Sequence, residues 1–219
     1  MLEPSFIGRA VTLKLTAKDL GKRFGPTWVF RDLSVSISGG QSLAVTGRNG
    51  SGKSTLLRIL SGLLRPSTGS VALFRGTEEL EPQHHVHAVG FVSPTLSFYK
   101  KMTARENLRF VSQVRGSGDG PKDFAELFER VGLRGREDDL VGSYSSGMLQ
   151  RLRLAAALVH SPSVLLLDEP FSNLDEQGFA IVESIMNGHT ANGGVVVLAT
   201  NSATEAQLCQ SSIVIPEIN

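Results

Sequence analysis

The chain has 219 residues, 41% of them hydrophobic, and its 22 basic and 21 acidic side chains leave a net charge of +1. This length fits one good core with room for a small inserted lobe. The near-neutral charge excludes the basic surface of a nucleic-acid-binding protein. A single cysteine, Cys209, cannot form an internal disulfide and suits a reducing cytosol. No signal peptide is expected, and no stretch approaches the roughly 20 apolar residues of a membrane span.

The N-terminal part of the chain predicts β-structure. Residues 11–17 and 33–37 alternate apolar and polar side chains, the pattern of half-exposed strands. Residues 22–26 between them predict a turn that carries an exposed aromatic ring, Phe24. The apolar run at 41–46 predicts a short buried strand, and we expect the two alternating strands to lie antiparallel beside it.

A glycine-rich stretch follows this buried strand and fits the pattern G-x-x-x-x-G-K-S/T of a phosphate-binding loop. Glycines let backbone N–H groups turn inward around phosphate oxygens, Lys53 can reach the β- and γ-phosphates, and the Ser54 hydroxyl can hold Mg²⁺. The helix predicted from Ser54 to Leu60 points its positive dipole end at the same phosphates. A turn that binds nothing is the alternative, which the flanking strand and helix disfavour. The expected phosphate-binding residues are Gly47, Arg48, Asn49, Gly50, Ser51, Gly52, Lys53, Ser54 and Thr55.

Beyond this helix, a turn and a further strand are predicted up to Phe74. The segment that follows contains His84, His85 and His87, which could indicate a metal site. No cluster of cysteines or carboxylates accompanies these histidines, so we expect a solvated loop instead. Residues 89–92 then predict a buried strand.

Helical character begins at Thr103, which forms the pattern of a capping box with Glu106. This helix is expected to end in a flexible glycine-rich connection at 115–120. Residues 121–131 have the apolar spacing of a second, amphipathic helix that stops at Gly132. The middle of the chain therefore predicts helices rather than strands.

The C-terminal third alternates helices with apolar strands. Residues 147–160 predict a helix, and the fully apolar run 164–167 is typical of a central parallel strand covered on both faces. A helix from Asn173 to Met186 leads to a second central strand at 195–200. Strands that alternate with helices predict an α/β fold with a mainly parallel sheet.

These elements together predict a single domain over residues 1–219 with an antiparallel β edge. Residues 1–93 and 147–219 would form the α/β core. Residues 94–146 would form a helical subdomain inserted into that core.

Two acidic residues, Asp168 and Glu169, follow the apolar run directly. Open parallel sheets bind ligands at the carboxyl ends of their strands. Asp168 is therefore expected to hold Mg²⁺, and Glu169 to orient and deprotonate a water that attacks the γ-phosphorus. A plain surface turn is the alternative, and the phosphate-binding loop disfavours it.

A third segment, residues 144–151, precedes and begins a helix. Ser145 is a natural N-cap residue, and a helix N-terminus with a serine and a glycine before it can bind an anion. Taken alone, this segment would be an ordinary helix start.

These motifs, in this order, resemble the ATP-binding-cassette (ABC) family over nearly the whole chain. The resemblance implies the P-loop NTPase, RecA-like fold and an ATPase that binds ATP and Mg²⁺. The family signature Leu-Ser-Gly-Gly-Gln is replaced here by Tyr144, Ser145, Ser146, Gly147 and Met148. The resemblance further implies a head-to-tail homodimer, or a paired cassette, in which Ser145, Ser146 and Gly147 of one copy complete the ATP site of the other.

The resemblance also assigns roles to single residues. Phe24 matches the aromatic residue that stacks on adenine, and Asp175 matches the residue that communicates across the dimer.

Two further departures from the family pattern matter more than those in the signature. A glutamine is expected after the strand 89–92, and the spacing to later residues places Pro94 there. A histidine is expected after the strand 195–200, and Asn201 stands there. An asparagine amide can donate a hydrogen bond to the γ-phosphate but carries no positive charge. We therefore hypothesise ATP binding with slowed or altered hydrolysis.

The resemblance implies the ATPase subunit of an ABC transporter. A chain with one cassette and no membrane span would need a second cassette and a separate transmembrane subunit, which would hold it at the cytoplasmic face of the cell membrane. The region 94–99 and the inserted helices would form the docking surface. The compact chain resembles small exporter cassettes, such as the haem-exporter ATPase of cytochrome c maturation, so export is the expected direction.

Three other functions remain as alternatives. They are a non-transport cassette, a low-turnover ATP-binding regulatory partner and a phosphate-loop kinase. The segment 145–147 disfavours the kinase, because kinases of this class have no such element.

Overall fold

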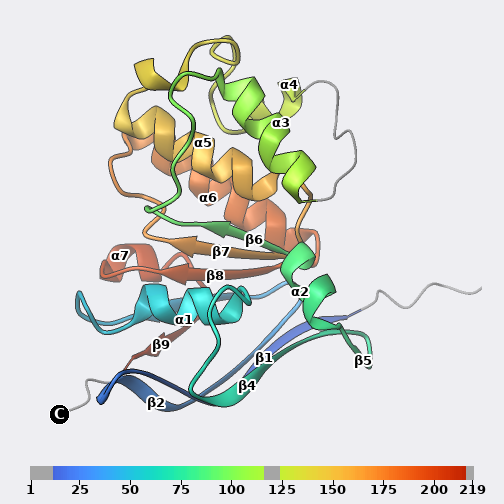
Figure 1. Cartoon of the computed structure of the whole chain (residues 1–219), viewed down its shortest axis with the longest axis vertical. Coiled ribbons are helices and arrows are strands. Elements are labelled where there is room, and N and C mark those ends of the chain that lie inside the picture. Colours follow the sequence, from blue (N-terminus) through green and yellow to red (C-terminus); the bar gives the residue numbers. More distant parts are fainter. Residues whose placement is uncertain (1–11, 116–123, 216–219) are drawn as a thin grey trace, which may run out of the picture.

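The computed structural model describes residues 12–115 and 124–215, which form stacked layers of sheets and helices (Figure 1). Three predictions fall partly outside the described residues. They concern the first residue of the strand at 11–17, the connection at 115–120 and the helix start at 121–123.

The antiparallel strands form a sheet of their own with the order β2-β1-β4-β5. These strands are β1 (Leu13–Phe24), β2 (Thr27–Ser38), β4 (Thr68–Arg75) and β5 (Glu78–Glu79). We expected the first two strands to lie beside the phosphate-binding strand. Instead, β1 pairs with β2 on one side and β4 on the other, so both of its hydrogen-bonding edges are used.

The second sheet is entirely parallel, with the order β6-β7-β8-β3-β9. Its strands are β3 (Ser42–Thr46), β6 (Val89–Val92), β7 (Val164–Asp168), β8 (Val195–Ala199) and β9 (Ser211–Val214). The predicted α/β class with a mainly parallel sheet is confirmed. Because β7, β8 and β3 are neighbours, the residues that follow each of them meet at one edge of the sheet.

Helices fill the space between the sheets and cover the outer face of the parallel sheet (Figure 1). They are α1 (Lys53–Leu60), α2 (Pro82–Ala88), α3 (Ala104–Val114), α4 (Ala125–Arg130), the 3-10 turn η1 (Val141–Ser143), α5 (Ser146–Leu158), α6 (Glu176–Ala191) and α7 (Ala203–Ala206). Helix α1 lies between the two sheets, α5 and α6 lie on the opposite face, and α3 and α4 pack on α5. None of the helices in the described ranges is both long and apolar enough to cross a bilayer.

The central strand β7 separates two apolar cores. Its alternate residues Leu165 and Leu167 join the core under α5 and α6, whereas Val164 and Leu166 join the core around α1 and the antiparallel sheet. Successive strand residues point to opposite faces, and both faces are buried here. The burial of both faces explains why residues 164–167 are all apolar.

The histidine segment differs from its prediction. It forms helix α2 rather than a solvated loop, with Pro82 in the first turn, where proline suits a helix. His85 is buried, and its Nε2 lies 2.7 Å from the Leu60 carbonyl oxygen, so this ring joins α2 to the end of α1. The histidines therefore differ in their surroundings, which the sequence spacing could not indicate.

Two helix starts depend on capping side chains. Thr103 and Glu106 form the predicted capping box at the start of α3. Helix α6 begins at Glu176 rather than at Asn173, because the Asp175 side chain accepts a hydrogen bond from the Gly178 N–H at 2.8 Å. Asn173 itself has a left-handed backbone, with φ of 62°, and lies in the preceding turn.

Candidate nucleotide site

The predicted phosphate-binding loop joins β3 to α1. Gly47, Gly50 and Gly52 have φ values of 144°, 85° and 102°, a region that side chains other than glycine rarely adopt. A Cβ atom on Gly47 would also lie 2.7 Å from the Ser51 Oγ. The glycines therefore permit a tight loop whose backbone can approach a ligand closely.

Lys53 begins α1 and is buried, with 5% of its surface exposed. Its Nζ donates to the carbonyl oxygens of Gly47 at 2.8 Å and Arg48 at 3.1 Å. The ammonium group thus lies within the loop, beside the positive end of the α1 dipole. Both features favour a polyanion such as a phosphate chain.

Ser54 and Asp168 come together from opposite ends of the sequence. The Ser54 hydroxyl donates to Asp168 Oδ1 at 3.0 Å. Asp168 is only 2% exposed, and burial raises the pKa of its carboxyl, although the Ser54 hydrogen bond and the Lys53 charge act the other way. A hydroxyl and a carboxylate at this distance fit Mg²⁺, which binds few protein oxygens together with phosphate oxygens.

A cleft of about 330 Å³ opens over this loop. It is lined by Val29, Asn49, Gly50, Gly52, Lys53, Ser54, Thr55 and Glu169. Glu169 has a left-handed backbone, with φ of 48°, and its N–H donates to the Ala199 carbonyl oxygen at 3.0 Å. Since glutamate rarely adopts this conformation, the surrounding hydrogen bonds must hold it there.

Asn201 follows β8 and reaches the phosphate-binding loop. Its Nδ2 donates to Asn49 Oδ1 at 3.1 Å. The side chain at the predicted γ-phosphate position is therefore held against the loop by an amide pair. Sequence reasoning did not anticipate this contact, because the two residues are far apart in the chain.

The structure separates the remaining predicted residues from this cleft. Ser145 caps α5 by accepting a hydrogen bond from the Met148 N–H at 3.2 Å, and Ser145 and Ser146 are exposed. Phe24, 55% exposed, lies beside the β1–β2 turn with the Lys22 ammonium 5.0 Å from its ring centroid. None of these residues, nor Gly147 or Asp175, lines the cleft over the loop.

Sequence reasoning missed two residues that the structure brings to this region. Val29 of β2 lines the cleft, which follows from the packing of the antiparallel sheet on α1. Gln150 of α5 is 5% exposed, and its Nε2 donates to the Pro170 carbonyl oxygen at 3.0 Å. The available signal was an uncharged polar residue at helical spacing from the apolar Leu154 and Ala157.

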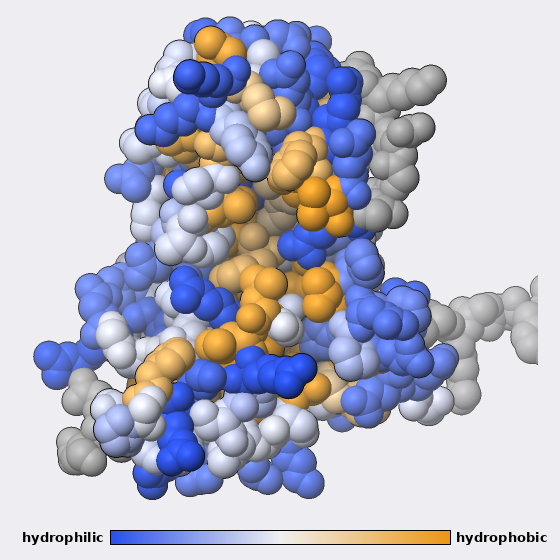
Figure 2. Space-filling view, viewed as in Figure 1, coloured by the Kyte–Doolittle hydropathy of each residue, from blue (hydrophilic) through white to orange (hydrophobic). Residues whose placement is uncertain are grey.

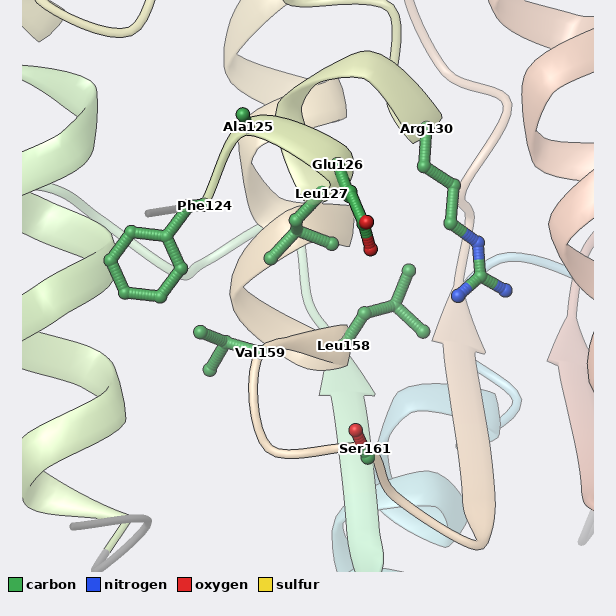
Figure 3. Close-up of a pocket in the computed structure, with 8 residues that line it drawn as sticks. All are labelled: Phe124, Ala125, Glu126, Leu127, Arg130, Leu158, Val159 and Ser161. Carbon is green, nitrogen blue, oxygen red and sulfur yellow. The ribbon is translucent and has the colours of Figure 1, made fainter. Parts of the chain in front are cut away.

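Two other cavities contain none of the predicted nucleotide-binding groups. One, of about 600 Å³, lies between α4 and the end of α5, with Phe124, Glu126 and Arg130 in its wall (Figure 3). The other is a groove of about 540 Å³ between α1 and α3. Its lining residues are Arg58, Leu63, Phe91, Ser93, Thr95, Leu96, Ser97, Phe110, Val111, Val114, Arg115 and Ala156. Figure 2 shows apolar side chains gathered in a hollow between the two halves of the molecule.

Comparison with known proteins identifies the family. A family model described as "ABC transporter" matches residues 30–172. The chain belongs to this family. It is 37% identical over 193 residues to the cytochrome c biogenesis ATP-binding export protein CcmA of Agrobacterium fabrum, covering 86% of this chain and 89% of CcmA. It is 35% identical over 204 residues to the uncharacterized ABC transporter ATP-binding protein YdbJ of Bacillus subtilis, covering 92% of this chain but 66% of YdbJ.

The fold comparison agrees. A solved structure described as the ATP-binding subunit of an ABC transporter superposes with a TM-score of 0.80 at 25% identity, covering 91% of this chain and 85% of the other. The predicted P-loop NTPase fold is thereby confirmed. The prediction of an ABC-type ATPase subunit is confirmed as well, and as a member of this family the chain binds nucleotide.

Proposed function

We propose that this chain hydrolyses Mg²⁺-ATP as one of two cassettes that share their ATP sites, and that it drives a separate membrane-embedded subunit. One observation carries the proposal. The loop, Lys53, Asp168 and Glu169 lie together within the chain, whereas the start of α5 is exposed and has no such group beside it among the residues that the structure describes. A second cassette placed head to tail would bring the two halves together.

The chemistry follows from the groups around the cleft. The loop N–H groups and Lys53 would bind the phosphates, and Ser54 and Asp168 would hold Mg²⁺, which when bound supplies charge for the developing negative oxygens. Glu169 would accept a proton from a water whose oxygen bonds to the γ-phosphorus as the bond to the β–γ bridging oxygen breaks. Asn201 Nδ2 would donate to the γ-phosphate. ADP and phosphate would then leave.

The groove between α1 and α3 is the surface we propose for the membrane subunit. Its apolar rim residues Leu63, Phe110 and Val114 are 63%, 44% and 69% exposed. Exposed apolar side chains gathered in a hollow are typical of interaction sites. The family relation supports a membrane partner, and the export protein CcmA among the relatives supports export as the direction. The chain would then lie at the inner face of the membrane.

Mixing two inactive variants tests the shared site. Lys53→Ala removes the loop lysine, and Ser145→Arg places a bulky cation at the start of α5. Each variant alone should lose hydrolysis. Mixed in equal amounts, half of the pairs would contain both variants and one intact composite site, so roughly a quarter of wild-type activity should return. A mixture as inactive as its components would overturn the proposal, provided that both variants keep the wild-type melting temperature.

Recovery from membranes tests the docking groove. Purification in mild detergent should recover the wild-type chain with an integral membrane protein, and Val114→Asp should lose that protein. Leu140→Asp is the matched control, because Leu140 is exposed but lies outside the groove. Equal recovery with both variants would contradict the placement of the partner in the groove.

A further inference from the structure

A chain of hydrogen bonds crosses α5 from the groove to the backbone beside Glu169. Arg153 Nε donates to the Leu96 carbonyl oxygen at 3.0 Å, and Arg153 NH1 donates to Gln150 Oε1 at 3.0 Å. Gln150 Nε2 then donates to the carbonyl oxygens of Pro170 at 3.0 Å and Glu169 at 3.5 Å. We call the side chains of Gln150 and Arg153 the α5 bridge.

The bridge ends on a residue whose backbone needs support. Glu169 is held in a left-handed conformation, with φ of 48°. On one side its N–H bonds to Ala199 in β8, and on the other the Gln150 amide contacts its carbonyl and that of Pro170. A strained conformation persists where several contacts determine it together. Removing the Gln150 contact should therefore let the Glu169 carboxylate move.

The other end of the bridge lies in the wall of the groove. Leu96 lines the groove with Thr95 and Ser97, in the loop after β6. Pro94 occupies the position in this loop where the family resemblance placed a glutamine. A proline has no side-chain amide, so this position offers neither an oxygen ligand to a metal ion nor a side-chain hydrogen bond to a water. The bridge begins two residues later, through a backbone carbonyl.

We propose that the α5 bridge positions Glu169 and makes this position depend on whether the groove is occupied. Gln150 and Arg153 are positioning residues, because they act on Glu169 through its backbone and do not line the cleft. An occupant that moves the 95–97 loop would pull on Arg153 and shift Gln150 against the Glu169–Pro170 peptide. The proposal rests on the proposed function, in which Glu169 activates the water.

The first test uses a matched pair of arginine variants on α5. Arg153→Lys keeps the charge but lacks the planar guanidinium that donates to both the Leu96 carbonyl oxygen and Gln150 Oε1. Arg151→Lys is the control, because Arg151 NH1 donates to the Gly132 carbonyl at 2.9 Å and has no bond to the bridge. Arg153→Lys should lower kcat for ATP about ten-fold with KM and melting temperature unchanged, and Arg151→Lys should leave kcat unchanged.

A double variant tests whether the bridge acts as a unit. If it does, Gln150→Ala and Arg153→Ala together should lower kcat no more than the more severe single change. Additive losses, a wild-type kcat in Arg153→Lys, or a parallel fall in kcat and melting temperature would each overturn the proposal. Failure of the proposed function itself would look different. The wild type would then show no ATP turnover, or Glu169→Gln would keep it.

The second test places a probe in the groove. In a Cys209→Ser background, Ser97→Cys provides one thiol on the exposed groove loop, which is alkylated with a fluorescein maleimide. Alkylation should change kcat about three-fold when the bridge is intact and leave it unchanged when Arg153→Ala is added. No change with the intact bridge, or the same change without it, would overturn the dependence of Glu169 on an occupied groove.

Discussion

The chain contains two helix starts with similar local chemistry and different surroundings. Helix α1 begins with a glycine, a buried lysine and a serine, and the serine lies 3.0 Å from Asp168 of the same chain. Helix α5 begins with two exposed serines and a glycine, and the Ser145 side chain caps its own helix. Both starts can bind an anion. Neighbouring elements, rather than the helix start itself, therefore decide which one carries phosphate-binding and metal-binding groups together.

Sheet order explains the difference. The strands β7, β8 and β3 are adjacent, so Asp168, Asn201 and the loop after β3 meet at one edge of the sheet. Helix α5 lies on the other face from α1, above the apolar core that it shares with α6. Its start has no comparable acidic partner among the described residues. In our proposal, the second copy of the chain supplies what faces it.

The largest effect is expected at Glu169, which lines the cleft over the phosphate-binding loop. Glu169→Gln removes the base while it keeps the side-chain shape, so hydrolysis should fall by at least roughly 100-fold. ATP binding should remain, because the loop and Lys53 are intact. Steady-state phosphate release and equilibrium ATP binding measure the two effects. Glu176→Gln, in the first turn of α6, is the control and should hydrolyse normally. Turnover of Glu169→Gln within ten-fold of wild type would show that the base lies elsewhere.

A smaller effect is expected at Asn201, which contacts Asn49 in the phosphate-binding loop. Because Asn201 carries no positive charge, wild-type turnover should lie below the ordinary range of roughly 1 s⁻¹ or more. A hydrogen bond to a charged group contributes about 1.5–3 kcal/mol, so Asn201→Ala should lower kcat about ten-fold or more. Asn201→His restores a ring donor and should recover most of that loss. Unchanged turnover in Asn201→Ala would remove Asn201 from the γ-phosphate contacts.

The smallest effect concerns stability without nucleotide. Because burial raises the pKa of Asp168, the folded state binds its proton more tightly than the unfolded state. The stabilisation from that proton is fully present below the unfolded pKa and is lost as pH rises through the raised folded pKa. Ionised Asp168 therefore lowers the free energy of unfolding at pH 7, and Asp168→Asn should raise it.

Urea unfolding between pH 5 and pH 8 without Mg²⁺ or ATP measures this effect. The difference between Asp168→Asn and wild type should shrink as pH falls. Each kcal/mol gained would raise the melting temperature by roughly 2–4 °C for a chain of this size. Asp175→Asn, at the start of α6, should change little, since asparagine caps a helix as well as aspartate. If Asp168→Asn were less stable than wild type at pH 7, that result would contradict a raised pKa for Asp168.

Motifs of adjacent residues were predictable from the sequence. The loop spacing from Gly47 to Thr55, the capping box at Thr103 and the apolar run before Asp168 each depend on local backbone chemistry, and the structure contains each of them. The prediction of a solvated loop at the histidine segment was wrong, because the buried His85 ring contacts the Leu60 carbonyl oxygen at the end of another helix. The predicted partner of β1 was wrong for a similar reason. Alternation predicts a strand but does not identify its partner.

Contacts between distant residues required the tertiary structure. Asn49 and Asn201, Ser54 and Asp168, and the bridge from Leu96 to Glu169 all join segments that only the sheet order and the packing of α5 bring together. The sequence by itself determined the phosphate-binding loop, the acidic strand end and the family, because these depend on residue type and short spacing. The fold alone decided that one helix start lies beside those acidic groups and the other faces outward, because burial and strand order are properties of the whole chain.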